Sequence, residues 1–289
     1  TTAEGGCGVY STADHSALWT LGARTNDPAV RLRLSPGGDV VAVKFQNGRT
    51  EVHSLTAASD APPMWVSDVP FALTQFSEDG RMLVCSHADT HGARRASCIR
   101  LETGAIEANM PAPDHNVMTC DATASRVAFA SEVLSVTNVE DARELWSIPL
   151  PAPASAIAWS PEGQRLAVAL THRNNPESQE ENREFADFPV LIFDPETGRQ
   201  LSTFAELPSN AARLTFDPTG ETLAVATWHG GLLWGSVQPD GFRLRMEGAQ
   251  RALRFSQNGT KLAFSPSPDE LGLLELVLPA IRQAWTPQA

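Results

Sequence analysis

Hydrophobic and polar positions along the chain follow one repeated pattern. An apolar alternating stretch leads into a short polar turn with a glycine, and a second apolar stretch follows. This order predicts two antiparallel strands joined by a tight turn. Five clear copies occupy residues 32–43, 74–85, 157–168, 214–225 and 253–264.

A sixth, weaker copy covers residues 119–129 and has alanine in the place of the glycine. The turn positions are therefore separated by 42, 44, 39, 57 and 39 residues, counted between Gly38, Gly80, Ala124, Gly163, Gly220 and Gly259. A period near 40 residues is typical of a four-stranded propeller blade. The long interval contains a polar insertion.

Further strands follow each pair. Third strands are expected at residues 190–193 and 271–276, and fourth strands marked by tryptophan at 17–21, 144–148 and 283–286. The runs are rich in Val, Leu, Phe and Ala, which suits strands buried between neighbouring sheets.

The turns resemble the Phe-Ser-Pro-Asp-Gly type, and residues 193–198 read Phe-Asp-Pro-Glu-Thr-Gly. Both features are similar to the WD40-repeat family, in the loose form common in bacterial proteins. The resemblance covers almost the whole chain and implies an all-β, WD40-like β-propeller of four-stranded blades, with residues 1–289 as one domain. The strict Gly-His and Trp-Asp signatures are missing, so PQQ-like, TolB-like and lactonase propellers stay open as variants of the fold.

The blade count leaves a remainder at the start of the chain. Six blades can be written in full, and residues 8–11 and 17–21 read as two outer strands of another. These strands either pair with the last blade and close a ring, or an upstream segment of the same polypeptide supplies the missing strands. Closure is favoured because it removes an exposed sheet edge. We expect seven blades, with six as the alternative.

Composition narrows the classes of partner. The net charge is −12 and Lys44 and Lys261 are the only lysines, so nucleic acid is not an expected partner. No run of 18 apolar residues exists, so no membrane span is expected. The first residues carry no leader pattern, so the compartment is not fixed, although the cytoplasm is favoured.

The four cysteines lack metal-type spacing. Cys85 and Cys98 face each other across a predicted hairpin, which makes a disulfide conceivable. Reduced, buried thiols are the favoured interpretation, because the cysteines lie in apolar stretches. No metal, cofactor or catalytic residue is assigned.

Candidate binding residues lie in loops that the family topology would place on one face, the top face. The longest are residues 86–95 and the polar insertion 171–189. Long loops on a rigid scaffold often carry recognition, although a disordered insertion without a role is an equal alternative. The partner-binding candidates are Arg94, Arg95, His172, Arg173, Phe185, Phe188, Trp228 and His229.

Each candidate has a chemical reason to bind a partner and an alternative, purely structural role. Arg94 and Arg95 could clamp a carboxylate or phosphate, or form a solvated turn. Trp228 beside His229 and a Gly-Gly pair could anchor a partner, or pack over a blade edge. Five histidines also map to top-face connections and could bind a metal, although none forms a recognisable ligand pair: His87, His91, His115, His172 and His229.

The chain lacks a nucleophile elbow, a P-loop, a dinucleotide fingerprint and a His-Glu-x-x-His motif. These absences weigh against an enzyme without excluding one. The resemblance to WD40-repeat proteins implies a protein-interaction scaffold, without enzyme activity, in a larger signalling or assembly protein, and this is the favoured function. One alternative is a lactonase-like, metal-dependent propeller hydrolase. Another is an architectural subunit completed by an upstream fragment of the same polypeptide.

Overall fold

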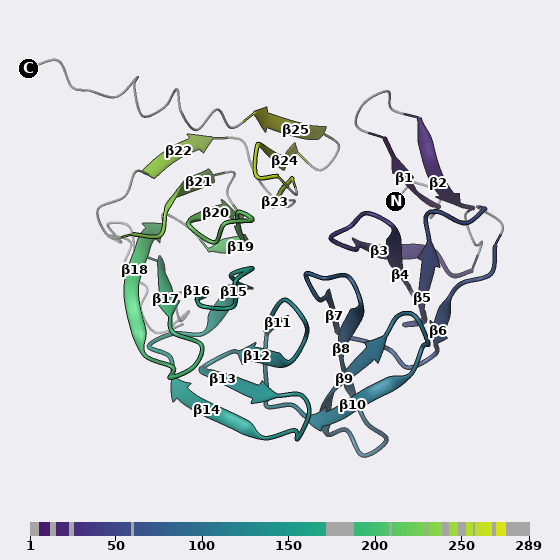
Figure 1. Ribbon diagram of the computed structural model, residues 1–289, viewed down its shortest axis with the longest axis horizontal. Helices are drawn as coiled ribbons and strands as arrows, with labels where there is room; N and C mark the ends of the chain where they lie inside the picture. Colours follow the sequence, from purple (N-terminus) through teal and green to yellow (C-terminus); the bar gives the residue numbers. More distant parts are fainter. Residues whose placement is uncertain are drawn as a thin grey trace, which may run out of the picture. The chain divides into compact units, whose positions relative to one another are not determined.

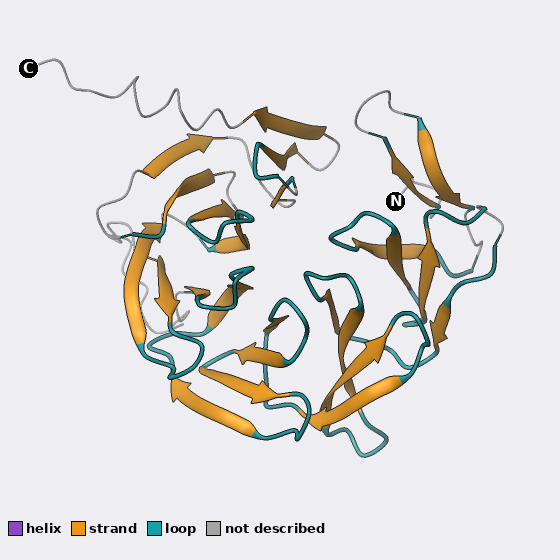
Figure 2. Cartoon of the chain, in the orientation of Figure 1, coloured by secondary structure: helices purple, strands orange, loops and turns teal. Residues whose placement is uncertain are grey.

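The computed structural model consists of short β-strands joined by turns (Figure 2). It describes residues 6–11, 16–22, 26–58, 61–171, 188–207, 210–228, 231–238, 243–247, 253–256, 258–267 and 270–275. Within these ranges no helix is long and apolar enough to cross a membrane.

Five sheets have four strands each, and in each the strands follow one another in chain order (Figure 1). The first two are β3 (Ala29–Leu34), β4 (Val40–Phe45), β5 (Thr50–Ser54), β6 (Trp65–Ser67) and β7 (Leu73–Phe76), β8 (Met82–Ala88), β9 (Arg94–Arg100), β10 (Ile106–Pro111). The third is β11 (Val117–Cys120), β12 (Arg126–Ala130), β13 (Val133–Asn138), β14 (Glu144–Pro149). The last two are β15 (Ala154–Trp159), β16 (Leu166–Leu170), β17 (Phe188–Phe193), β18 (Gln200–Leu207) and β19 (Ala211–Phe216), β20 (Thr222–Thr227), β21 (Gly231–Ser236), β22 (Arg243–Glu247).

The remaining strands form two smaller sheets. β1 (Cys7–Tyr10) pairs with β2 (Ala17–Leu21), and β23 (Leu253–Phe255), β24 (Lys261–Ser267) and β25 (Glu270–Glu275) form a sheet of three. The expected count of seven or six blades is therefore wrong, because the described residues form five complete ones. The count had taken the last repeat as a full blade, whereas its described residues form three strands, and the two strands at the start of the chain as part of a seventh. The fourth strand expected at 283–286 lies outside the described residues.

The chain divides into two compact units, which we describe separately. The first comprises residues Thr1–Asp114, Cys120–Val127 and Thr137–Glu144, and the second the other residues, including Leu145–Ala289.

The repeated turn has the same backbone at all six predicted positions. Its last residue has a positive φ in every copy, from 58° at Ala124 to 74° at Gly38 and Gly163. That residue's N–H donates to the carbonyl oxygen of the residue three positions earlier, as Gly163 does to Ser160 at 2.9 Å and Ala124 to Asp121 at 3.1 Å. L-residues with a Cβ avoid this conformation, so the pattern explains the glycines and makes Ala124 the strained exception.

The first residue of a turn, such as Ser160 or Asp217, also bonds through its side chain to the backbone N–H five positions later. Ser160 Oγ accepts a hydrogen bond from Arg165 N at 2.9 Å, and Asp217 Oδ1 accepts one from Thr222 N at 2.8 Å. Both opening residues are buried, so these bonds satisfy polar atoms that water cannot reach.

In the second unit the central strands are buried on both faces. Every residue of β16 is buried. Ala167 and Ala169 pack with the sheet β19–β22, whereas Leu166, Val168 and Leu170 pack with β12 and β13. Because side chains alternate across a strand, β16 contributes side chains to two hydrophobic cores, one on each face of its sheet.

The first unit has the same layered packing. Ala42 and Val52 pack against Phe76 and Leu83 of the next sheet. On the other side, Val41, Val43 and Phe45 pack with Cys7 and Trp19 of the β1–β2 hairpin. Both faces of the β3–β6 sheet are therefore covered by a neighbouring sheet, as blade stacking requires.

The cysteines are free and buried, which confirms the interpretation of reduced thiols. Cys85 lies opposite Ser97 and Cys98 opposite Val84, so the two thiols are on opposite faces of the sheet and do not meet. Burial raises the pKa of Cys98 to about 12 and holds the pKa of Cys85 well above its usual value. These thiols therefore stay protonated and act as small apolar side chains.

Candidate functional site

Second-to-third-strand turns and sheet-to-sheet connections lie at the same end of each sheet, as the family topology implies. In the first unit Gln46 N donates to Pro28 O at 3.0 Å, and Ala112 N donates to Arg94 O at 3.0 Å. In the second unit Trp228 N donates to Asn210 O at 3.0 Å. Each bond joins such a turn or its flanking strand to a connection. We keep the name top face for these turns and connections, within each unit.

The β4–β5 turn of the first unit is fixed from several sides. Asn47 N donates to Asp27 Oδ1 at 3.0 Å, and Asn47 Oδ1 accepts from Arg49 N at 2.7 Å. Gly48 has a φ of 93°, and a Cβ at this position would lie 2.5 Å from Pro70 Cβ. Only glycine fits here, so the turn is held rigidly against the β6–β7 connection.

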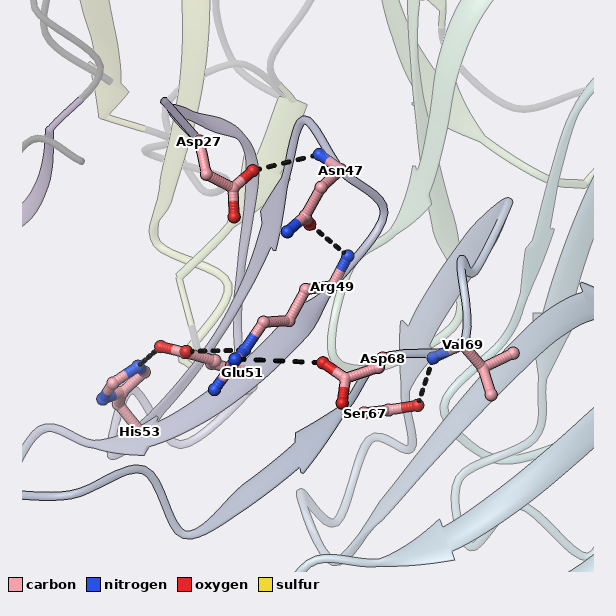
Figure 3. A network of polar contacts seen from close by, with 8 residues as sticks. All are labelled: Asp27, Asn47, Arg49, Glu51, His53, Ser67, Asp68 and Val69. Carbon is pink, nitrogen blue, oxygen red and sulfur yellow. Dashed lines mark hydrogen bonds and ion pairs between the residues drawn. The ribbon is translucent and has the colours of Figure 1, made fainter. Parts of the chain in front are cut away.

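A buried carboxylate lies directly below this turn (Figure 3). Glu51 Oε1 is 3.0 Å from Arg49 Nε, and Glu51 Oε2 is 3.0 Å from His53 Nε2. Arg49 also approaches Asp68 Oδ1 at 3.8 Å, and the His53 ring centroid is 5.1 Å from that of Trp19. A buried charge is tolerated only with such partners, so the network fixes β5 beneath the β1–β2 hairpin.

The predicted arginine pair lies in β9 and does not converge. Strand β8 extends to Ala88 and β9 begins at Arg94, so the loop expected at 86–95 is shorter than expected. Arg94 Nε is 2.8 Å from Asp114 Oδ1, and Arg95 donates to Oδ1 and the backbone O of Asn109 at 3.0 and 2.7 Å. Neighbouring residues of a strand point to opposite faces, so each arginine has its own surroundings.

In the second unit Trp228 lies in the turn after β20 with 51% of its surface exposed. Trp159 and Trp234 of the same unit are buried. Trp228 N donates to Asn210 O, and Gly231 N at the start of β21 donates to Thr227 Oγ1 at 2.9 Å. A large apolar ring is thus presented to solvent directly after the end of β20.

The other candidates are placed only in part. Phe188 is the first residue of β17, so the last two residues of the predicted insertion belong to this strand. His172, Arg173, Phe185 and His229 lie outside the described residues.

The described histidines make contacts within their own units. His87 Nε2 lies 3.0 Å from Ser97 Oγ, and its ring meets Phe71 edge-on at 5.7 Å. His91 is exposed in the turn before β9, and His115 is buried against Phe129. Within the described ranges no three His, Cys, Asp or Glu side chains lie close enough to hold a metal ion.

The structure adds a pair that sequence reasoning missed. Arg31 of β3 lies directly opposite Lys44 of β4. Lys44 is a charged residue inside the apolar run of β4, and this break in the pattern was the available signal.

No protein-family model and no curated protein sequence matches the chain. Solved structures do. A chain of a mitotic checkpoint complex matches with a TM-score of 0.71 and 11% identity over 92% of this chain and 83% of that one. A chain of the hydrazine synthase of Kuenenia stuttgartiensis matches with a TM-score of 0.68 and 14% identity over 89% and 80%. At such identities the likeness shows the fold alone, and the fold is an all-β propeller of four-stranded blades.

Proposed function

We propose that this chain is a protein-interaction scaffold that binds a partner protein through its top-face loops. The observation that supports this proposal best is Trp228, a half-exposed tryptophan that directly follows β20 and whose backbone N–H donates to Asn210 O. Tryptophan is among the side chains enriched at the energetic centre of protein interfaces. A residue anchored at the end of a strand also has less conformational freedom to lose when a partner binds.

The other predicted contact residues belong to the same proposal. They are Arg94, Arg95, His172, Arg173, Phe185, Phe188 and His229. Arg94 is exposed and its partner Asp114 is largely exposed too, so water screens this ion pair and a stronger acidic partner can replace it.

The experiment compares proteins captured from the source organism by the wild-type chain, by Trp228→Ala and by Leu201→Ala, with quantitative mass spectrometry. Leu201 is a matched control, because it is 44% exposed in β18 of the same unit. We expect one protein to be enriched by the wild type and by Leu201→Ala, and to be reduced at least tenfold by Trp228→Ala. Equal enrichment by all three chains would contradict the role of Trp228. A stoichiometric divalent metal in the purified protein would instead favour the hydrolase.

A second candidate function is architectural, and the β1–β2 hairpin favours it. This sheet has two strands, and it exposes 55% of Tyr10 and 56% of Leu18. Added strands would complete a blade, as in β-augmentation. Native mass spectrometry of the protein from its source tests this idea. A chain that travels alone at all concentrations would speak against it.

A further inference from the structure

Two positive side chains are opposed on the inner strands of the first four-stranded sheet. Arg31 and Lys44 are direct cross-strand partners in β3 and β4. Like charges directly opposite each other destabilise a sheet. The position of Lys44 in the other complete blades, nine residues after the first turn residue, holds small side chains: Ser86, Ala130, Ala169 and Ala226. The pair is therefore a departure from the repeat.

The Lys44 ammonium is held in place. Its Nζ donates a hydrogen bond to the carbonyl oxygen of Phe71, in the β6–β7 connection of the top face. Burial and then the charge of Arg31 lower the pKa of Lys44. Arg31 is exposed beside it, so the two groups present positive charge from a half-buried position toward solvent.

No acidic side chain neutralises the pair within the described part of the chain, since none of the ion pairs there includes Arg31 or Lys44. The nearest carboxylate along β5, Glu51, lies opposite Val43, whereas Lys44 lies opposite Thr50. Glu51 therefore faces the other side of the sheet, toward Arg49 and His53.

We propose that Arg31 and Lys44 form a binding site for a phosphate group on the top face of the first unit. A guanidinium donates two parallel hydrogen bonds to phosphate oxygens, and an ammonium adds a point charge. A phosphate dianion carries two negative charges and so matches two cations, which converts the cross-strand repulsion into two attractions. The net charge of −12 repels anions elsewhere on the chain, so the site binds phosphate locally rather than through a general basic surface.

The experiment is a calorimetric titration of the full chain with inorganic phosphate at about pH 8, where the dianion dominates. Sodium chloride of equal ionic strength serves as the reference. We expect saturable binding with one site, and a melting temperature that rises with phosphate concentration. Arg31→Gln and Lys44→Gln should each weaken binding at least tenfold.

Two matched controls lie outside the site. Lys261→Gln removes the only other lysine, and Arg81→Gln removes an exposed arginine of the same unit. Both should bind phosphate as the wild type does. If Lys44→Gln fails to fold, Arg31→Gln still decides the question, because Arg31 is exposed.

Three results would overturn the proposal: no saturable binding above the chloride reference, Arg31→Gln binding like the wild type, or acetate binding as tightly as phosphate. A parallel titration with O-phosphoserine separates the sources of the group. Tighter binding than inorganic phosphate supports a phosphorylated side chain of a partner, and weaker binding supports free phosphate.

Discussion

The sheets β3–β6 and β15–β18 share their strand order and their turn, yet they differ in polarity at matching positions. Where β5 has Glu51 and His53, opposite Val43 and Val41, β17 has Leu191 and Phe193, opposite Val168 and Leu166.

The innermost strands differ in the same way. The opposed pair is Arg31 and Lys44 in one sheet and Ala156 and Ala169 in the other. At these matching positions, the same blade architecture thus holds charged side chains in the β3–β6 sheet and only apolar side chains in the β15–β18 sheet.

The difference teaches which features the blade requires. Both sheets keep the Ser-Pro turn with a glycine at a φ of 74°, and Lys44 is the one charged side chain in their second strands. Charged residues are accepted where hydrogen bonds reach them, as the carboxylate of Glu51 and the ammonium of Lys44 show. Turn geometry is therefore the fixed part of the blade, and strand positions that a hydrogen-bond partner can reach are free to carry charge.

The largest expected effect on stability lies in the β15–β18 sheet, which we call the apolar sheet. Phe193→Ala should lower the free energy of unfolding by about 3–5 kcal/mol, because it leaves a cavity between two sheets. Chemical denaturation monitored by tryptophan fluorescence measures this loss. The exposed control Leu201→Ala should cost well under about 1 kcal/mol. Equal losses for both variants would mean that this sheet is not the apolar anchor we describe.

A smaller effect on stability is expected in the β3–β6 sheet, which we call the polar sheet. Glu51→Leu introduces the residue of the apolar sheet and should cost about 3 kcal/mol, because it leaves His53 and Arg49 without their acceptor. The double variant Glu51→Leu, His53→Phe replaces polar by apolar packing and should return to within about 1 kcal/mol of the wild type. Thermal and denaturant unfolding measure both. A double variant as unstable as the single one would show that the two sheets are not interchangeable here.

The smallest effect on stability is expected in the β11–β12 turn, one of the six copies of the repeated turn. Ala124→Gly should raise the free energy of unfolding by about 1 kcal/mol, because glycine adopts the φ of 58° without strain. Ala122→Gly in the same turn is the control, since its φ is not positive, and it should be neutral or destabilising. A gain for Ala122→Gly and none for Ala124→Gly would break the claim that the turn is shared.

The parts of the fold that could be predicted are those whose sequence signals lie within a few residues of one another. The strands β16 and β20 and the six turns were predicted because their signals are local: alternation, proline and glycine at fixed spacing. Even Ala124 was assigned to the glycine position from spacing alone. The number of blades was predicted wrongly, because the described residues near the two ends form sheets of two and three strands, whereas the repeat suggests four.

The candidate site was predictable only in part. Trp228 was named because it lies beside His229 and a Gly-Gly pair, and the structure shows it exposed. Arg94 and Arg95 were expected to form either a clamp or a solvated turn, whereas they lie in a strand whose pleating separates their side chains. The opposition of Arg31 and Lys44 continues the register of the predicted 32–43 hairpin, in which Leu32 lies opposite Val43, but the sequence does not show that Lys44 is half-buried and bonded to Phe71 O.

The sequence by itself determined the repeating unit, since the backbone preferences of glycine and proline and the alternation of apolar residues act within a few positions. Tertiary structure alone decided which of the charged side chains are buried and what they reach outside their own hairpin. Lys44 reaches the carbonyl oxygen of Phe71, and the His53 ring meets that of Trp19, only after strands have paired in register and sheets have stacked. Contacts between residues far apart along the chain depend on that three-dimensional register, and no local pattern encodes it.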